Sequence, residues 1–243
     1  VVCCGVVGVC NSSHPGAMAS FALKAARQGY ISFAFTHADA LTLSHNGKRP
    51  YFGTNPVCVA VPREEEEPYC LDMATSMISW NKLLQYKSNN ENLEDLLAAD
   101  KEGEPTRDPQ EAVCLMPAGS YNGYGLSSMV DILCGVFTGM AFGRDIPNMY
   151  KAPMDQPRHL GQFYMVIRAD GCIEKVDFLS AMQQMTDEVR KEPAQEGKKV
   201  MLAGDPQKYE AAIRIKEGIP LDSVTLKEFK NLSLKYEVSL PLI

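Results

Sequence analysis

The chain opens with two short apolar runs, separated by a segment whose apolar residues recur every three to four positions. Residues 1–9 and 30–36 are the two runs, and each predicts a strand. The segment between them predicts a helix, because Pro15 suits a first helical position and Gly29 is placed to end the helix. His14 is then expected at the helix start. The pattern predicts a strand–helix–strand unit.

The middle of the chain continues with strands followed by helices. Residues 57–61 and 69–73 predict strands, and the acidic run 63–67 between them predicts a solvated hairpin loop. Helical spacing predicts helices over residues 76–86 and 123–142.

The last third mixes both kinds of element. Residues 144–160 contain three prolines and predict a linker or lid-like loop. The remaining predictions are strands over 162–169 and 199–203 and helices over 176–191, 206–216 and 225–234. Because strands and helices do not alternate strictly, an α/β fold with a mixed sheet is favoured over a doubly wound one.

Composition narrows the class of protein. A net charge of -6 argues against a nucleic-acid partner, which needs a concentrated basic face. The most apolar stretch, residues 124–142, carries Asp131 and several glycines, so we expect a buried helix and no membrane span. The eight cysteines form no CxxC pair, which favours reduced thiols in a cytoplasmic protein and no metal site. A strand that begins at residue 1 suggests that upstream sequence is missing.

The segment Asn11-Ser12-Ser13-His14-Pro15-Gly16 is the first candidate for chemistry. Reduction of a ketone by hydride leaves negative charge on the carbonyl oxygen, and a histidine that titrates near neutrality can supply the proton. A helix N-terminus at the same place would favour an anionic substrate. Taken alone, a histidine at such a position is more often one that only caps or packs against the helix.

Two further segments are candidates for holding phosphate or ribose. Asp72-Met73-Ala74-Thr75-Ser76 joins a strand to a helix, although Thr75 or Ser76 can simply be an ordinary N-cap. Residues 119–125 form a glycine-rich turn that matches neither GxGxxG nor the Walker pattern. Among the other histidines, His37 and His45 near strand ends are weaker site candidates, and His159 is expected to be exposed. The GxSxG elbow of an α/β-hydrolase is absent from the sequence.

Taken in order, these segments resemble one family, the NAD(P)-dependent malate/L-lactate dehydrogenases, which includes ureidoglycolate and sulfolactate dehydrogenases. The resemblance covers essentially the whole chain, and several motifs in the right order are more specific than any one of them. The matching motifs are Asn11–Gly16, Phe35–Ala38, Gly53–Pro56, Asp72–Ser76, Gly103–Pro109, Gly119–Leu126, Leu202–Asp205 and Gly218–Ile219.

The resemblance implies a non-Rossmann, mixed-sheet NAD(P)-binding fold, usually a homodimer, that transfers hydride between NAD or NADP and a small 2-hydroxy/2-oxo acid. It implies a catalytic and NAD(P)-binding region over residues 1–160 and an α/β region over 161–243 that completes the same fold, with the family's N-terminal segment absent. His14 matches the family's acid/base. The positions that match cofactor-contacting segments are Ala38, Asp72, Met73, Ala74, Thr75, Asn122, Gly204 and Asp205.

The chain departs from the family pattern in several places. Asn122 stands where the family has a lysine, His37 replaces an asparagine, and Ala203-Gly204-Asp205 replaces Pro-Gly-Glu. An upstream Arg-x-Asp-Ser-His-Gly motif, expected to bind the substrate carboxylate, is absent. The alternative is therefore a catalytically impaired relative or fragment that acts as a cofactor-binding or dimerisation protein. The sequence leaves open which 2-oxo acid is used and whether the cofactor is NAD or NADP.

Overall fold

The structure is a computed structural model that describes residues 3–153 and 155–240. The first two residues of the predicted strand 1–9 lie outside the described residues. The chain forms two compact units, residues 1–204 and residues 205–243. Each unit is described by itself.

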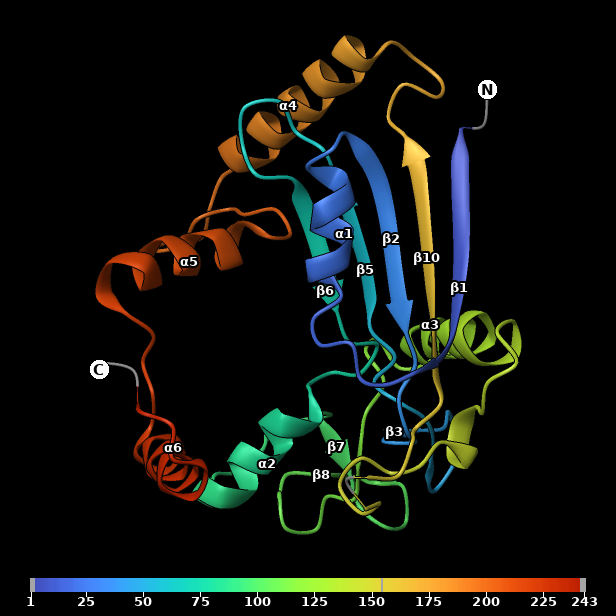
Figure 1. Cartoon of the computed structure of the whole chain (residues 1–243), viewed down its shortest axis with the longest axis vertical. Helices are drawn as coiled ribbons and strands as arrows, with labels where there is room; N and C mark the ends of the chain where they lie inside the picture. Colours follow the sequence, from blue (N-terminus) through green and yellow to red (C-terminus); the bar gives the residue numbers. More distant parts are fainter. Residues whose placement is uncertain (1–2, 154, 241–243) are drawn as a thin grey trace. The chain divides into compact units, whose positions relative to one another are not determined.

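A five-stranded sheet forms the centre of the first unit, with strand order β1-β10-β2-β5-β6 (Figure 1). All four neighbouring pairs are antiparallel. The strands are β1 (Cys4–Ser12), β10 (Leu160–Arg168), β2 (Tyr30–Thr36), β5 (Val57–Val61) and β6 (Tyr69–Met73). An all-antiparallel sheet of this kind differs from the parallel Rossmann sheet.

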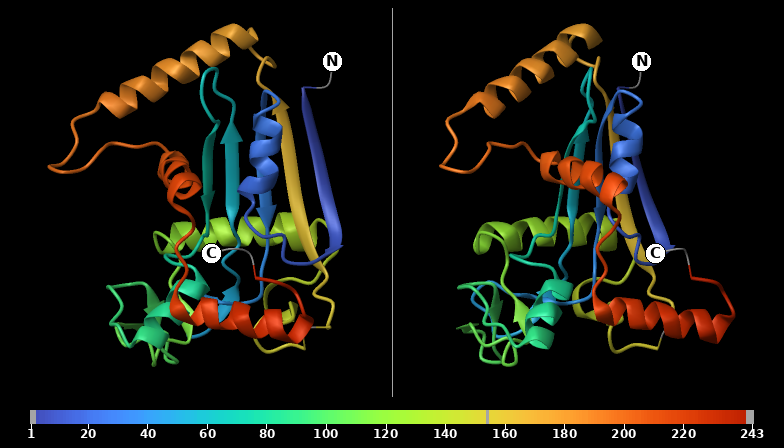
Figure 2. Two further views of the ribbon diagram at one scale, coloured as in Figure 1. Left: turned by 60° about the vertical axis from the view of Figure 1, so that its left-hand side comes forward. Right: turned by 90° about the vertical axis from the view of Figure 1, so that its left-hand side faces the viewer.

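The two faces of this sheet bury different residues because side chains alternate along each strand. Ala34 on β2 packs with Cys58 and Cys70 against helix α1 (Ala19–Ala26). The next residue, Phe35, packs instead with Val130 and other apolar residues of helix α3 (Tyr121–Asp131) and the turn that follows it. Seen along the sheet edge, α1 and α3 lie on opposite sides of the strands (Figure 2, right).

A second sheet has the order β4-β3-β9-β7-β8, and its β3–β9 pair is parallel while the other pairs are antiparallel. Its strands are short: β3 (Thr42–Leu43), β4 (Pro50–Phe52), β7 (Ala98–Ala99), β8 (Pro105–Thr106) and β9 (Cys114–Leu115). Helix α2 (Trp80–Asn89) contributes Leu83 to the core beside β7 and β9. The predicted α/β class with mixed sheets is confirmed.

Two predicted helix starts are wrong. Helix α1 begins at Ala19, so His14 and Pro15 precede it in an irregular segment. Gly16 has φ +80, a left-handed conformation that cannot belong to a right-handed helix. Helix α2 begins at Trp80, because the Ser79 side chain accepts a hydrogen bond from the Lys82 N–H and caps it.

The predicted helix 123–142 is also shorter and less regular than expected. After α3, residues Ile132–Val136 form a π-helical turn, and Gly139 at φ +71 turns the chain away. The predicted strand 199–203 is absent from the described residues, where a hydrogen bond from Cys70 N–H to Ala203 O holds the segment beside β6.

The remaining elements agree closely with prediction. The strands over 30–36, 57–61 and 69–73 have the predicted bounds, and α4 (Lys175–Lys191) begins one residue early. The second unit contains α5 (Asp205–Glu217) and α6 (Ser223–Tyr236), and neither helix has a buried residue. Among the described helices, none is both long and apolar enough to cross a bilayer.

Candidate functional site

One end of the five-stranded sheet gathers most of the candidate residues. Because the strands are antiparallel, β1, β2 and β6 end there, while β10 and β5 begin there. The register fixes this, since Ser12 lies opposite Leu160 and Thr36 lies opposite Gln162. The segments that carry His14, Ala38 and Asp72 therefore leave the sheet at the same end.

His14 is exposed in the irregular segment between β1 and α1, residues 13–18, hereafter called the His14 turn. Its Nδ1 accepts a hydrogen bond from the Gly16 backbone N–H at 3.1 Å. A neutral imidazole that accepts at Nδ1 carries its proton on Nε2. The acid in ketone reduction is the imidazolium, which carries protons on both ring nitrogens, so the exposed ring must take up a second proton and release its contact with Gly16 before it can act.

Asp72, at the end of β6, holds the start of helix α1. Its Oδ2 accepts a hydrogen bond from the Ala19 N–H at 2.8 Å. Desolvation by burial raises the pKa of the Asp72 carboxyl, and the hydrogen bond from Ala19 opposes that rise. The α1 N-terminus that was expected to favour an anionic substrate is thus occupied by a side chain of the protein itself.

Ala38 is positioned by a buried polar network. Its N–H donates to Asn55 Oδ1 at 3.0 Å, and Asn55 Nδ2 donates to Ser127 O at 2.9 Å. Asn55 Nδ2 also lies 3.3 Å from Asp131 Oδ1, while the second Asp131 oxygen accepts the Gly143 N–H at 2.9 Å. These bonds fix the turn after β2 against α3.

His37 belongs to the same network and not to an open site. It is 1% exposed, and its Nε2 accepts the Gly161 N–H at 2.8 Å while its Nδ1 lies 3.4 Å from Asp131 Oδ1. The earlier candidate His37 is therefore a core residue. Asn55 and Asp131, which sequence reasoning did not single out as functional, are its partners; the Gly53–Pro56 motif and a carboxylate within an apolar stretch were the available signals.

Thr75 connects the end of β6 to the glycine-rich turn. It is fully buried, its Oγ1 donates to Thr54 O at 3.0 Å, and its carbonyl accepts the Ala118 N–H at 2.9 Å. Met73 is exposed and Ala74 half-buried beside it. Asn122 is exposed in the first turn of α3, where its N–H contacts Gly119 O at 3.3 Å. The structure brings Asp72–Thr75 and the Asn122 turn close together.

Gly204 lies against β6. At φ +92, a Cβ on this residue would stand 3.0 Å from Cys70 O, so the close approach favours glycine. Asp205 follows it as the first residue of α5. Gly204 is the last residue of the first unit and Asp205 the first residue of the second, so only Gly204 is placed beside β6.

The two remaining histidines have different surroundings. His159 is exposed, as expected, and its Nδ1 lies 3.0 Å from Asn11 Oδ1, next to the His14 turn. His45 is exposed and packs edge-on against Tyr121, with ring centroids 5.1 Å apart. It lines a cavity of about 350 Å³ together with Ser120 of the glycine-rich turn.

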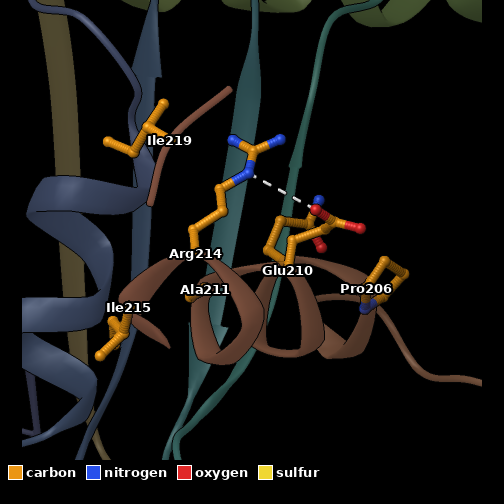
Figure 3. Close-up of a pocket in the computed structure, with 7 residues that line it drawn as sticks. Pro206, Glu210, Ala211, Arg214, Ile215 and Ile219 are labelled. Carbon is orange, nitrogen blue, oxygen red and sulfur yellow. Dashed lines mark ion pairs between the residues drawn. The ribbon is translucent and has the colours of Figure 1, made fainter. Parts of the chain in front are cut away.

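A separate cavity of about 610 Å³ lies along α5 in the second unit (Figure 3). Glu210 and Arg214 in its wall point toward one another, with Arg214 Nε 3.5 Å from Glu210 Oε2. None of the predicted site residues lines it. In the part of the chain that the structure describes, no cluster of three metal-ligating side chains occurs.

The residues at the sheet end fit a dinucleotide. A Cβ on Gly16 or Gly119 would meet nothing within 4 Å, so there is free space beside the backbone of these two turns. Open backbone beside a helix start suits a phosphate, and the exposed His14 imidazole suits proton transfer to a small substrate. Fold and site together define a non-Rossmann α/β protein with a candidate oxidoreductase site.

The chain belongs to the malate/L-lactate dehydrogenase family, whose model matches residues 2–230. It is similar to the ureidoglycolate dehydrogenase (NAD(+)) of Escherichia coli (strain K12), with 40% identity over 162 residues that cover 67% of this chain and 46% of that protein. The malate/(S)-sulfolactate dehydrogenase of Methanothermus fervidus is 29% identical over 238 residues, covering 97% of this chain and 68% of that protein.

Solved structures of dehydrogenases have the same fold as this chain. The malate dehydrogenase of Entamoeba histolytica superposes with a TM-score of 0.89 at 28% identity, covering 98% of this chain and 70% of that one. The sulfolactate dehydrogenase of Methanocaldococcus jannaschii gives a TM-score of 0.86 at 25% identity, covering 97% of this chain and 67% of that one. The chain thus spans between about half and about 70% of the length of these relatives.

Proposed function

We propose that this protein is an NAD(P)-dependent oxidoreductase that interconverts a 2-hydroxy acid, of the malate or lactate kind, and its 2-oxo acid. The observation that carries the proposal is the exposed His14 imidazole, which lies at the same end of the central sheet as the Asp72 segment and beside the uncrowded backbone of Gly16. The names of the relatives support it, because ureidoglycolate, malate and sulfolactate are all hydroxy acids.

The cofactor would be held by Ala38, the end of β6 and the turn that precedes α3. The contacting residues in this proposal are Ala38, Asp72, Met73, Ala74, Thr75, Asn122 and Gly204, with Asp205 following Gly204 in the chain. When bound, the nicotinamide supplies hydride. Both NAD and NADP are candidates, since similar proteins are named for each.

In the reductive direction, His14 as the imidazolium donates a ring proton to the oxygen of the 2-oxo group as negative charge develops there, and the ring is left neutral. In the oxidative direction, the neutral ring accepts the hydroxyl proton and becomes the imidazolium. Buried Asn55 fixes Ala38, and Asp72 fixes the start of α1 beyond the His14 turn. These residues hold the reacting groups in place and do not take part in the chemistry.

The remaining parts of the proposal concern the whole protein. We propose that residues 1–160 carry the catalytic and NAD(P)-binding region, and that residues 161–243 complete the same fold. In support, β10 from the later region lies between β1 and β2 in the central sheet. A homodimer located in the cytoplasm is the form that we propose for the protein.

The test is oxidation of NADH and NADPH, followed by absorbance, with oxaloacetate, pyruvate and sulfopyruvate as substrates. We expect His14→Ala to lower kcat by roughly 10²- to 10⁴-fold. Asp170→Asn, which changes an exposed residue beyond the opposite end of β10, is the control and should stay within about twofold.

Near-normal turnover in His14→Ala would remove His14 from the mechanism. Tight binding of NADH without turnover of any of the three acids would favour the cofactor-binding alternative instead.

A further inference from the structure

Arg158 lies beside the proposed site but has no part in the function described so far. It precedes β10 directly, and the neighbouring His159 reaches Asn11 at 3.0 Å. Leu160, two residues further on, lies opposite Ser12. The register therefore brings Arg158 to the sheet end from which the His14 turn departs.

The Arg158 side chain is 10% exposed and forms a buried ion pair with Asp39, which is 3% exposed. Its Nη2 donates to the Asp39 carboxylate and, at 3.1 Å, to Pro147 O. The second Asp39 oxygen accepts the Met149 N–H at 3.3 Å. The pair thus ties the turn after β2 to the loop that precedes β10.

The guanidinium is only half satisfied. Nε and Nη1 of Arg158 are buried and have no hydrogen-bond partner among the described residues. These two nitrogens carry three of the five N–H bonds of an arginine. Buried donors are nearly always paired, and an unpaired one next to a charge is costly. A buried arginine kept in this state is expected to have an acceptor that arrives from outside the protein.

We propose that Arg158 binds an acidic group of the 2-oxo acid substrate, an inference that rests on the function proposed above. The unpaired Nε and Nη1 offer charge-assisted hydrogen bonds to a carboxylate or sulfonate oxygen. Asp39 occupies the Nη2 side, and its negative charge repels a second anion there. Because Nε and Nη1 lie on opposite edges of the guanidinium, with Nη2 between them, the substrate's acidic group binds at one of these two nitrogens and not across both.

Because Nε and Nη1 are buried, entry of the substrate requires part of the surrounding chain to move, and residues 147–153 form the irregular loop that contacts the ion pair directly. This loop is irregular, and Met149 and Tyr150 in it are exposed. Two hydrogen bonds tie it to the ion pair, those made by Pro147 O and the Met149 N–H. Loops with few buried contacts open at low cost in free energy.

A tryptophan near this loop provides a probe that does not depend on turnover. Trp80 is the only tryptophan in the sequence. Its ring centroid lies 6.1 Å from that of Tyr150, whose hydroxyl donates to Asn81 Oδ1 at 3.0 Å. Burial raises the pKa of Tyr150, the charge of Asp39 raises it further and that of Arg158 lowers it, so this phenol lies within electrostatic reach of the pair.

The experiment is a titration of Trp80 fluorescence with oxalate, with and without NADH, repeated by calorimetry. Arg158→Lys keeps a cation for Asp39 but loses the extra N–H groups, so oxalate affinity should fall about 10- to 100-fold while the melting temperature changes little. Arg107→Lys, in an exposed pair with Asp95, is the matched control and should bind oxalate like the unaltered protein.

Asp39→Asn separates ligand binding from a merely structural role. If the pair only holds the loop, Asp39→Asn and Arg158→Lys weaken oxalate binding alike. If Arg158 binds the ligand, Asp39→Asn leaves oxalate affinity unchanged or increased, because it removes a repelling charge. Equal loss in both variants overturns the proposal, as does unchanged affinity in Arg158→Lys or the absence of oxalate binding by the unaltered protein.

Turnover gives a second readout. Arg158→Lys should raise KM for the 2-oxo acid about tenfold or more while the Kd for NADH stays unchanged. Failure of the proposed function would show as no turnover with any acid, while the oxalate titrations still decide the role of Arg158. An unchanged KM in an active Arg158→Lys variant refutes only the role of Arg158.

Discussion

Asp72 provides the most direct test of how the site is assembled, because one oxygen of its side chain caps α1 while its charge is poorly solvated. Asp72→Ala removes the acceptor of the Ala19 N–H at 2.8 Å. Loss of a capping acceptor costs about 1 kcal/mol of unfolding free energy, within a range of about 0.5–2 kcal/mol. Asp72→Asn keeps an acceptor oxygen and removes only the charge.

The pH dependence of these variants has a definite sign. Burial raises the pKa of Asp72 above its ordinary value of 3.8, so the folded protein favours the protonated form. The contribution of Asp72 to stability is therefore fully present below pH 3.8 and declines as the pH rises through the raised pKa. Relative to the unaltered protein, Asp72→Asn should gain stability between pH 4 and pH 7, and Asp72→Ala should be the least stable of the three near pH 4.

Urea unfolding at pH 4 and pH 7 measures these differences. Asp170→Asn is a control with the opposite sign, because the hydrogen bond from Arg168 lowers the pKa of exposed Asp170. Its stabilising effect is present at neutral pH and disappears as the pH falls through the lowered pKa. If the stability difference between Asp72→Asn and the unaltered protein does not change with pH, the argument from desolvation is wrong.

Three further changes test the buried network, the packing of the sheet and the cofactor turn. Asn55→Ala should lower the unfolding free energy by about 2–4 kcal/mol, because the buried Ala38 N–H and Ser127 carbonyl lose their partner and Asp131 loses one of its donors; urea unfolding measures this, and a loss below about 1 kcal/mol would contradict it. Gly161→Ala should abolish folding or cost more than about 4 kcal/mol, since its Cβ would stand 1.6 Å from Cys134 O. Circular dichroism and urea unfolding check this against Gly5→Ala, whose Cβ has ordinary contacts and which should lose less than about 1 kcal/mol. Asn122→Lys, at an exposed position, should tighten NADPH binding about threefold to tenfold at low salt and less at high salt. Fluorescence titration at two ionic strengths measures this. Equal affinities of the variant and the unaltered protein at low salt would count against a cofactor phosphate near this turn.

Local sequence patterns predicted the central strands well. Proline, acidic residues and polar turn residues flank the apolar runs over 57–61 and 69–73. The observed strands have the same limits as these runs. The helix start before α1 was not predictable in the same way. Pro15 is compatible with a helix, but the adjacent Gly16 adopts φ +80, and that choice depends on how the His14 turn leaves the sheet.

The candidate site was only partly visible in the sequence. Motif order located His14, Asp72 and the glycine-rich turn, but the segment around Asp72 gave no sign that its carboxylate caps α1, 53 residues earlier in the chain. Arg158 lay in a segment predicted to be a linker or lid-like loop. The alternatives for His37 could be separated only when the structure showed it buried beside Asp131.

The sequence by itself determined which segments have the hydrophobic spacing of a strand or a helix, because this spacing and the turn residues act over a few positions. The order of the motifs along the chain determined the family. Tertiary structure alone decided which distant side chains meet. Asn55 reaches Asp131 across 76 positions, and Asp39 pairs with Arg158 across 119. Such contacts depend on strand register and helix packing, and no local pattern encodes which buried donor will face which acceptor.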